Sequence, residues 1–181
     1  RKIVSIVFPD DQVYAFEVKV DPAAQQFTPI RYPEMVFEPV FGTVGSLEAV
    51  AETGIEVSPL SGAVSLLKDD FSFEPYNPTR FILTLQDGTT FEVDADLDLI
   101  ALSDRNGNTL TIDEDGVYHT AGRSLQFTRD VEGRITRITD PEGRFLDYEY
   151  DSEGRLAKVY DRESQIPGSP LYGQFTEFRY D

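Results

Sequence analysis

One short pattern recurs at a fixed spacing in the second half of the chain and constrains its fold more than any other feature. Stretches of the form Asp-x-x-Gly occupy residues 104–107, 113–116, 130–133, 140–143 and 151–154. A type I turn favours Asp at its first position and Gly at its fourth. The carboxylate can accept backbone N–H groups, and the glycine can adopt the left-handed conformation that returns the chain. The pattern predicts hairpin turns defined by Asp104, Gly107, Asp130, Gly133, Asp140, Gly143, Asp151 and Gly154.

The turns from Asp130 onward are separated by intervals of 10 and 11 residues, which gives a period of 21 residues. Aromatic residues share this period, because they stand three residues before, or directly before, the aspartates. A fixed period with insertions at turns indicates a repeat array, in which each unit packs against its neighbours. These repeat aromatics are Phe91, Phe127, Tyr148, Tyr150, Tyr160 and Phe178. We expect Tyr148 and Tyr150 to pack between strands.

The rest of the chain also has strand-like patterns. Residues 3–8 and 13–20 flank a polar PDDQ and predict a hairpin, residues 35–41 a possible edge strand, and residues 47–53 either a strand or one helical turn. The dipeptide Asp87-Gly88 suits a two-residue turn between strands at 81–85 and 89–93. We therefore predict an all-β protein with antiparallel sheets. An N-terminal β-rich domain, residues 1–80, leads into repeat hairpins at residues 81–181.

Composition excludes several classes of function. The chain has 33 acidic and 16 basic residues, a net charge of -17, so a nucleic-acid-binding surface is not expected. It has no cysteine, which excludes a disulfide or a thiolate nucleophile, and no apolar run long enough to insert into a membrane.

The repeat resembles the YD-repeat, or Rhs-repeat, family. The matching residues are Tyr150-Asp151, Gly154-Arg155-Leu156 and Tyr160-Asp161, together with the stretches 127–144 and 103–112. Residues 1–80 loosely resemble the β-rich segment that precedes the first repeats in some large bacterial members. The family includes bacterial Rhs toxins, B and C components of insecticidal toxin complexes, and animal teneurins. The resemblance implies a β-sheet that curls into a hollow shell.

The expected function is that of a structural scaffold fragment of a large secreted or cell-surface bacterial protein, without enzymatic activity or cofactor. It would start or cap a β-shell that encloses or presents a C-terminal toxin. The alternative is an adhesion module whose loops around His119 and at 166–174 contact a glycan or a protein. Further repeats of the parent chain are the expected partners. Residues 175–180 are expected to pair with another chain or copy, to fold back or to be mobile, since their outer edge lacks a partner.

Candidate chemistry is sparse. His119 is the single histidine, and with Ser124 it suggests a hydrolytic triad only weakly, because no nucleophile-elbow sequence is present. Asp94, Asp96 and Asp98 alternate, so on a strand they would share one face and would be weak candidates for a calcium site. The preferred interpretation of these aspartates is solvated turn carboxylates, with no metal bound. Neither face of the repeat strands is cleanly apolar in the sequence, which predicts either a curved sheet with two partly polar faces or a β-bulge.

Overall fold

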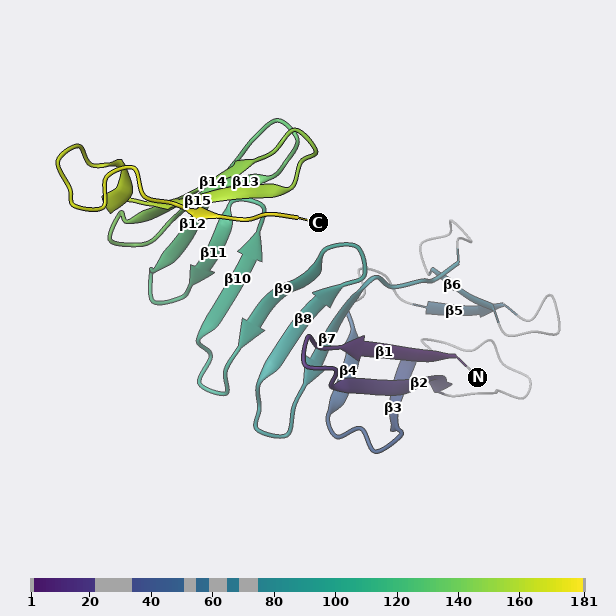
Figure 1. Ribbon diagram of the computed structural model, residues 1–181. Helices are drawn as coiled ribbons and strands as arrows, with labels where there is room; N and C mark the ends of the chain where they lie inside the picture. The colour runs from purple at the N-terminus through teal and green to yellow at the C-terminus, as the bar shows by residue number, and fades with distance from the viewer. Residues whose placement is uncertain (1, 22–33, 51–54, 59–64, 69–74, 181) are drawn as a thin grey trace, which may run out of the picture. The chain divides into compact units, whose positions relative to one another are not determined.

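The computed structural model of the chain describes residues 2–21, 34–50, 55–58, 65–68 and 75–180 (Figure 1). Every regular element in these residues is a β-strand except one 3-10 turn, and every strand pairing is antiparallel, which confirms the predicted fold class. Two compact units form, Arg1–Gly107 and Asn108–Asp181. No helix in the described residues has the length and apolarity needed to cross a bilayer.

The first unit packs two sheets around a small core. Its strands are β1 (Ile3–Val7), β2 (Val13–Asp21), β3 (Glu34–Val40), β4 (Ser46–Ala49), β5 (Ile55–Ser58), β6 (Ser65–Lys68), β7 (Arg80–Thr84), β8 (Thr90–Asp94) and β9 (Asp98–Ser103). One sheet has the order β1-β2-β3, and β4, β7, β8 and β9 pair in succession in the other. The core is formed by Phe16, Phe37, Leu47 and Leu83.

The alternating pattern of β2 explains why this core forms. Phe16 is fully buried, and Tyr14 and Val18 on the same face pack against the core. The predicted hairpin at 3–20 and the edge strand at 35–41 are confirmed as β1–β2 and β3. The segment 47–53 begins as strand β4, and its residues 51–53 lie outside the described part of the chain.

Residues 81–107, which the sequence places in the repeat region, belong to the first unit. Phe81 and Phe91 on β7 and β8 pack against its core, because the first hairpin of the repeat region supplies the sheet that covers β1–β3. The division into domains at residue 80 stays a prediction.

The turn between β7 and β8 also differs from the predicted two-residue turn. Gly88 N donates to Leu85 O at 3.1 Å, and Gly88 has φ +86° whereas Asp87 does not have a positive φ. This is a type I turn with a glycine at its fourth position, so it resembles the later Asp-x-x-Gly turns in backbone geometry.

The second unit is a single meandering sheet. Its strands follow one another in space as in sequence, from β10 (Thr109–Asp113), β11 (Gly116–His119), β12 (Ser124–Arg129), β13 (Ile135–Thr139) and β14 (Phe145–Tyr150) to β15 (Leu156–Asp161) and β16 (Thr176–Glu177) (Figure 1). A 3-10 turn, η1 (Glu163–Gln165), follows β15. All buried apolar side chains of the described residues lie in the first unit, so the second has no core of its own.

Two β-bulges give the second unit one apolar face. Thr128 pairs with Arg137 but Arg129 pairs with Ile135, which leaves Thr136 as an extra residue. The bulge brings Ile135 and Ile138, three residues apart, onto the same face. A second bulge lies 21 residues later, where Glu149 pairs with Lys158 and Tyr150 with Leu156. The face so formed carries Leu110, Ile112, Val117, Leu125, Phe127, Ile135, Ile138, Leu146, Tyr148, Tyr150, Leu156 and Val159.

The segment at 175–180 lies against β15. Thr176 and Glu177 pair with Val159 and Lys158, and Phe178 N donates to Ala157 O at 2.9 Å. No strand of the described residues pairs with the outer side of β16. The expected pairing of this edge with another chain or copy stays a prediction.

Candidate functional site: the repeat turns

The turn at 130–134 shows how the repeat motif is built. Gly133 N donates to Asp130 O at 3.0 Å, and Gly133 adopts φ +83°. The Asp130 carboxylate also binds the backbone of the turn. Its Oδ1 accepts hydrogen bonds from Glu132 N and Arg134 N at 3.1 and 2.9 Å. Its second oxygen, Oδ2, accepts Arg134 Nε at 2.8 Å. One aspartate thus binds two backbone donors and the side chain of the residue after the glycine, an arrangement that we call the Asp–Arg clasp.

The Asp–Arg clasp recurs at the next two turns. Asp140 Oδ2 accepts Arg144 Nε at 2.6 Å, and Asp151 Oδ2 accepts Arg155 Nε at 2.9 Å. In both turns Oδ1 accepts the same two backbone N–H groups, at 2.8 to 2.9 Å. A glutamate at the third position contacts each arginine, at 3.2 Å from Glu142 and 3.0 Å from Glu153. The repeating unit of structure is therefore Asp-x-Glu-Gly-Arg.

The hydrogen bonds of the clasp lower the pKa values of its three aspartates. Partial desolvation raises the pKa of Asp130 and Asp140, but the backbone and side-chain hydrogen bonds from the following arginine outweigh it, so both pKa values lie below the ordinary value of 3.8. The backbone hydrogen bond from Arg155 is the largest influence on Asp151, whose pKa is also lowered. The clasp therefore favours the ionised carboxylate, as a hydrogen-bonded anion beside a cation should.

Tyrosines connect one clasp to the next strands. The guanidinium of Arg134 lies over the ring of Tyr150, 4.6 Å from the centroid, and Tyr150 Oη donates to Ile135 O at 2.7 Å. The same pair of contacts recurs between Arg155 and Tyr180, at 5.0 Å, and from Tyr180 Oη to the carbonyl of the residue after Arg155, at 2.9 Å. Arg134 and Arg155 are therefore each held by their own turn and by a tyrosine, which lies on β14 for Arg134 and after β16 for Arg155.

Other predicted turns depart from this unit. Asp104 Oδ1 accepts Asn106 N at 2.7 Å, and Gly107 has φ +85°. In the turn at 113–116, Asp113 Oδ1 accepts Asp115 N and Gly116 N, but Gly116 lies in β11 without a positive φ. The prediction of a left-handed glycine at this turn is wrong. Instead, Gly116 allows the backbones of β11 and β12 to lie close together, because a Cβ on it would lie 2.1 Å from Leu125 O.

The pattern also changes where glycine is replaced. Ser164 stands in the glycine position after Asp161, and the chain forms the 3-10 turn η1 there. Ser164 is buried, its N donates to Asp161 Oδ1 at 2.8 Å, and its Oγ donates to Asp161 O at 2.7 Å. The insertion that follows thus begins with a different but fully bonded turn.

His119 occupies the aspartate position of a further turn of this type. Gly122 N donates to His119 O at 2.8 Å, and Gly122 has φ +82°. His119 Nδ1 accepts Ala121 N at 2.9 Å, as an aspartate oxygen does in the other turns. Ser124 lies on β12 opposite Tyr118. The histidine nitrogen that a triad aspartate would hold is already bonded to the backbone, so this geometry gives no support to a hydrolytic triad.

The predicted repeat aromatics take different positions. Tyr148 and Tyr150 lie on the apolar face of β14, and Phe127 lies on the same face of β12. The Cζ atom of Arg129 lies 5.9 Å from the centroid of the Phe127 ring. Tyr160 lies on the opposite face, where its hydroxyl donates to Glu149 at 3.2 Å.

The first and last members of the series are at the ends of the array. Phe91 is part of the first unit and packs edge-on against Phe8, with ring centroids 4.9 Å apart. Phe178 follows β16 and is 41% exposed. The aromatics therefore recur with the period of the sequence, but they differ in what they pack against and in how exposed they are.

The three alternating aspartates lie at the turn between β8 and β9 and not along one strand. Asp94 and Asp98 pair across the hairpin, Asp98 has φ +63°, and Asp94 Oδ1 accepts Asp96 N at 2.9 Å. The prediction that the three aspartates lie along one strand is wrong, because Asp94 ends β8, Asp98 begins β9 and Asp96 lies between the two strands. In the described part of the chain, no group of three or more acidic or histidine side chains is placed to hold a metal ion.

The opposite face of the second unit carries a polar network that the sequence patterns do not predict. Arg137 and Asp147 pair across β13 and β14, with Nη2 to Oδ2 at 2.7 Å, and Gln165 Nε2 donates to the same Oδ2 at 2.6 Å. The hydrogen bonds from Arg137 are the largest influence on the pKa of Asp147, which is lowered despite partial burial. Arg137 also lies over the Phe145 ring at 4.0 Å.

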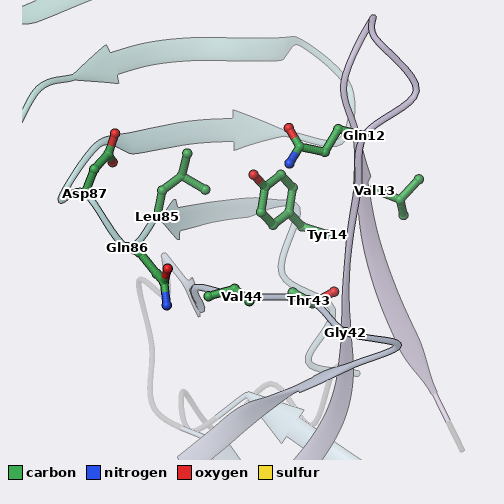
Figure 2. A pocket seen from close by; sticks show the side chains of 9 residues that line it. All are labelled: Gln12, Val13, Tyr14, Gly42, Thr43, Val44, Leu85, Gln86 and Asp87. Atoms are coloured by element: carbon green, nitrogen blue, oxygen red, sulfur yellow. The ribbon is translucent and has the colours of Figure 1, made fainter.

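A shallow pocket in the first unit gives no sign of chemistry (Figure 2). The Tyr14 side chain and the Gln12 amide point into it, whereas Asp87 and Val13 point away. Asp87 accepts Thr89 N at 2.9 Å, and this backbone hydrogen bond is the main reason for its lowered pKa. The nine residues that line the pocket include no nucleophile next to a base.

A comparison with known protein families gives a match over the repeat turns. A family model described as RHS Repeat matches residues 129–166, the stretch that contains the three Asp–Arg clasps. No curated protein matches the chain. The repeat match and the recurring clasp together support the assignment of residues 129–166 to the Rhs, or YD, repeat.

Proposed function

We propose that this chain is a scaffold that starts or caps the β-sheet of a large Rhs-repeat protein, and that its role is structural and not catalytic. The observation that carries the proposal is the contrast between the two units. The first has a buried core of its own, whereas the second is one layer of repeat strands without a buried apolar side chain among its described residues. Repeat units of this kind depend on their neighbours, and a terminal unit must protect the end of the array.

The partners proposed for this scaffold are further repeats of the same parent protein. The outer edge of β16, with which no strand of the described residues pairs, supports this, because unpaired strand edges accept another strand. We place the parent protein outside the cell or on the cell surface of a bacterium, where its shell would enclose or present a C-terminal toxin. The family assignment supports this placement.

A repeat insertion tests the scaffold proposal. A copy of residues 130–150 inserted between Tyr150 and Asp151 adds one period and keeps every later residue in phase. We expect the protein to remain folded with a Tm equal to or above that of the parent chain, because each repeat adds an interface with its neighbour. The matched control is the same insertion lacking one strand residue, which reverses the side-chain alternation. Equal effects of the two insertions would contradict the scaffold.

An adhesion module remains the second candidate, and the insertion after β15 favours it. Ile166, Leu171 and Tyr172 in this loop are 40%, 40% and 58% exposed, and exposed aromatic side chains can stack on sugars or protein partners. A glycan array and a cell-binding assay distinguish the two candidates. Saturable binding that is lost when residues 166–174 are deleted supports adhesion, and absence of binding by the folded chain contradicts it.

A further inference from the structure

The outer edge of β1 exposes a row of backbone hydrogen-bonding groups. Val18 N donates to Lys2 O, and Phe8 N donates to Gln12 O, both at 2.9 Å. Hydrogen-bonded pairs alternate along an antiparallel ladder, so Lys2, Val4, Ile6 and Phe8 direct their backbone groups toward β2. The N–H and C=O groups of the residues between them point to the other side, where no strand of the described residues pairs with β1. These residues are Ile3, Ser5 and Val7.

This edge lacks the features that usually keep a strand edge unpaired. Proteins protect exposed edges with charged side chains, prolines or bulges. β1 has the sequence IVSIV, without a charge or a proline, and its pairing with β2 is regular over its whole length. The opposite edge of the same sheet, β3, contains Pro39 together with Glu34 and Glu38. One edge of this sheet is therefore protected and the other is open.

A mostly apolar groove lies beside the open edge. Its lining includes the whole stretch from Val4 to Pro9 on one side. The other side comes from β7, β8 and β9 and carries Phe81, Phe91, Val93 and Leu99. All of these residues belong to the first unit. A strand added along β1 would find backbone partners at the edge and apolar side chains in the groove, which is the arrangement that β-strand addition uses.

Acidic groups at the groove indicate the charge of its occupant. Asp94 and Asp98 line it, and Asp98 is exposed. No arginine or lysine belongs to the lining, and the chain has a net charge of -17. We propose that the edge of β1 and this groove bind an extended segment of a partner protein in which apolar residues alternate and at least one lysine or arginine is present. Mutual repulsion of two strongly acidic chains disfavours a second copy as the occupant.

Hydrogen exchange measured by NMR on the full chain tests the site directly. The probe is a short acetylated and amidated peptide that alternates valine with lysine and threonine. We expect saturable binding that slows exchange of the Ile3, Ser5 and Val7 amides. A peptide of the same composition with N-methyl groups on one edge, and one with glutamate in place of lysine, should give no protection. Unchanged exchange at millimolar peptide would overturn the proposal, as would concentration-dependent protection without peptide, which indicates self-pairing.

Two protein variants make the test independent of the peptide controls. Ser5→Pro removes an outward N–H and leaves the ladder with β2 intact, so it should abolish binding. Asp98→Asn retains a residue that tolerates a positive φ, and it should weaken binding about two- to fivefold, as for an exposed ion pair. Glu132→Gln, which removes one charge in the other unit, is the matched control and should leave affinity unchanged. Equal affinity of the Asp98 and Glu132 variants would contradict the role of the acidic rim.

Discussion

The guanidinium of Arg134 lies over the ring of Tyr150, with its Cζ 4.6 Å from the ring centroid. Arg134 belongs to the turn after β12, whereas Tyr150 ends β14. The same arrangement joins Arg155 and Tyr180, and the arginines are one period of 21 residues apart. In these two cases the contact joins a Gly-Arg element of the repeat to a later Tyr-Asp element, because the arginine that closes the turn also provides the surface on which the tyrosine packs.

Removing the hydroxyl of Tyr150 should weaken the sheet. Tyr150→Phe leaves the ring over Arg134 but removes the hydrogen bond to Ile135 O, and we expect a loss of about 0.5 to 1.5 kcal/mol. Native-state hydrogen exchange of the β13 and β14 amides measures this loss within the second unit. Tyr172→Phe, in an exposed loop, should have no effect on the same amides and serves as the control.

Two glycines should respond differently to alanine. Gly143→Ala places a side chain at φ +76° in open space and should cost about 1 to 2 kcal/mol, and Gly143→Asn should cost less. Gly116→Ala has no φ penalty but puts Cβ 2.1 Å from Leu125 O, so β11 and β12 must separate. We expect a larger fall in Tm for Gly116→Ala than for Gly143→Ala, and the reverse order would show that the approach of these strands is not rigid.

The lowered pKa values of the turn aspartates predict sensitivity to acid. A carboxyl whose pKa is lower in the folded than in the unfolded state stabilises the fold above its unfolded pKa, near 3.8, and loses this contribution as pH falls through the folded value. The free energy of unfolding of the second unit should therefore fall as pH decreases below about 4. The triple variant Asp130→Asn, Asp140→Asn, Asp151→Asn should show a weaker pH dependence. An unchanged slope would exclude these three groups as its cause.

His119→Asp should stabilise the chain. An aspartate at this position, followed by Thr-Ala-Gly-Arg, completes the Asp-x-x-Gly-Arg pattern of the clasped turns. It would retain the hydrogen bond from Ala121 N and add the backbone and side chain of Arg123 as donors. We expect a gain of about 0.5 to 1.5 kcal/mol, read as a higher Tm. His119→Asn, which accepts from the backbone without a charge, should give a smaller gain. A lower Tm for the aspartate would contradict the equivalence of the turns.

The sequence predicts the strands well where its patterns are local. The alternation in β2 and the Asp-x-x-Gly spacing each depend on residues close together in the chain, so the hairpins could be located without a structure. The apolar face of the second unit could not be located, because it depends on bulges at Thr136 and after Glu149. The mixed faces of the repeat strands indicate a β-bulge as one of two explanations, but they do not give its position. A strict alternation would place Ile135 and Ile138 on opposite faces, whereas the bulge places them on the same face.

The Asp–Arg clasp was only half predictable. Turn preferences predict the roles of Asp130, Asp140 and Asp151, but they do not predict that the arginine after each glycine is the partner of the aspartate. Its periodic recurrence at 134, 144 and 155 was the signal that could have revealed it. The stacking of Tyr150 on Arg134 joins residues of different strands, so it required the register of the sheet.

A double-mutant cycle measures whether the arginine–tyrosine contact couples neighbouring repeats. Arg134→Gln, Tyr150→Leu and the double variant are compared by hydrogen exchange of the β13 and β14 amides. We expect a coupling free energy of about 0.5 to 1 kcal/mol, as for an exposed cation–π pair. The Arg144 and Tyr160 pair, which makes no such contact, should show no coupling. Strictly additive effects of the Arg134 and Tyr150 substitutions would show that the contact does not couple the repeats.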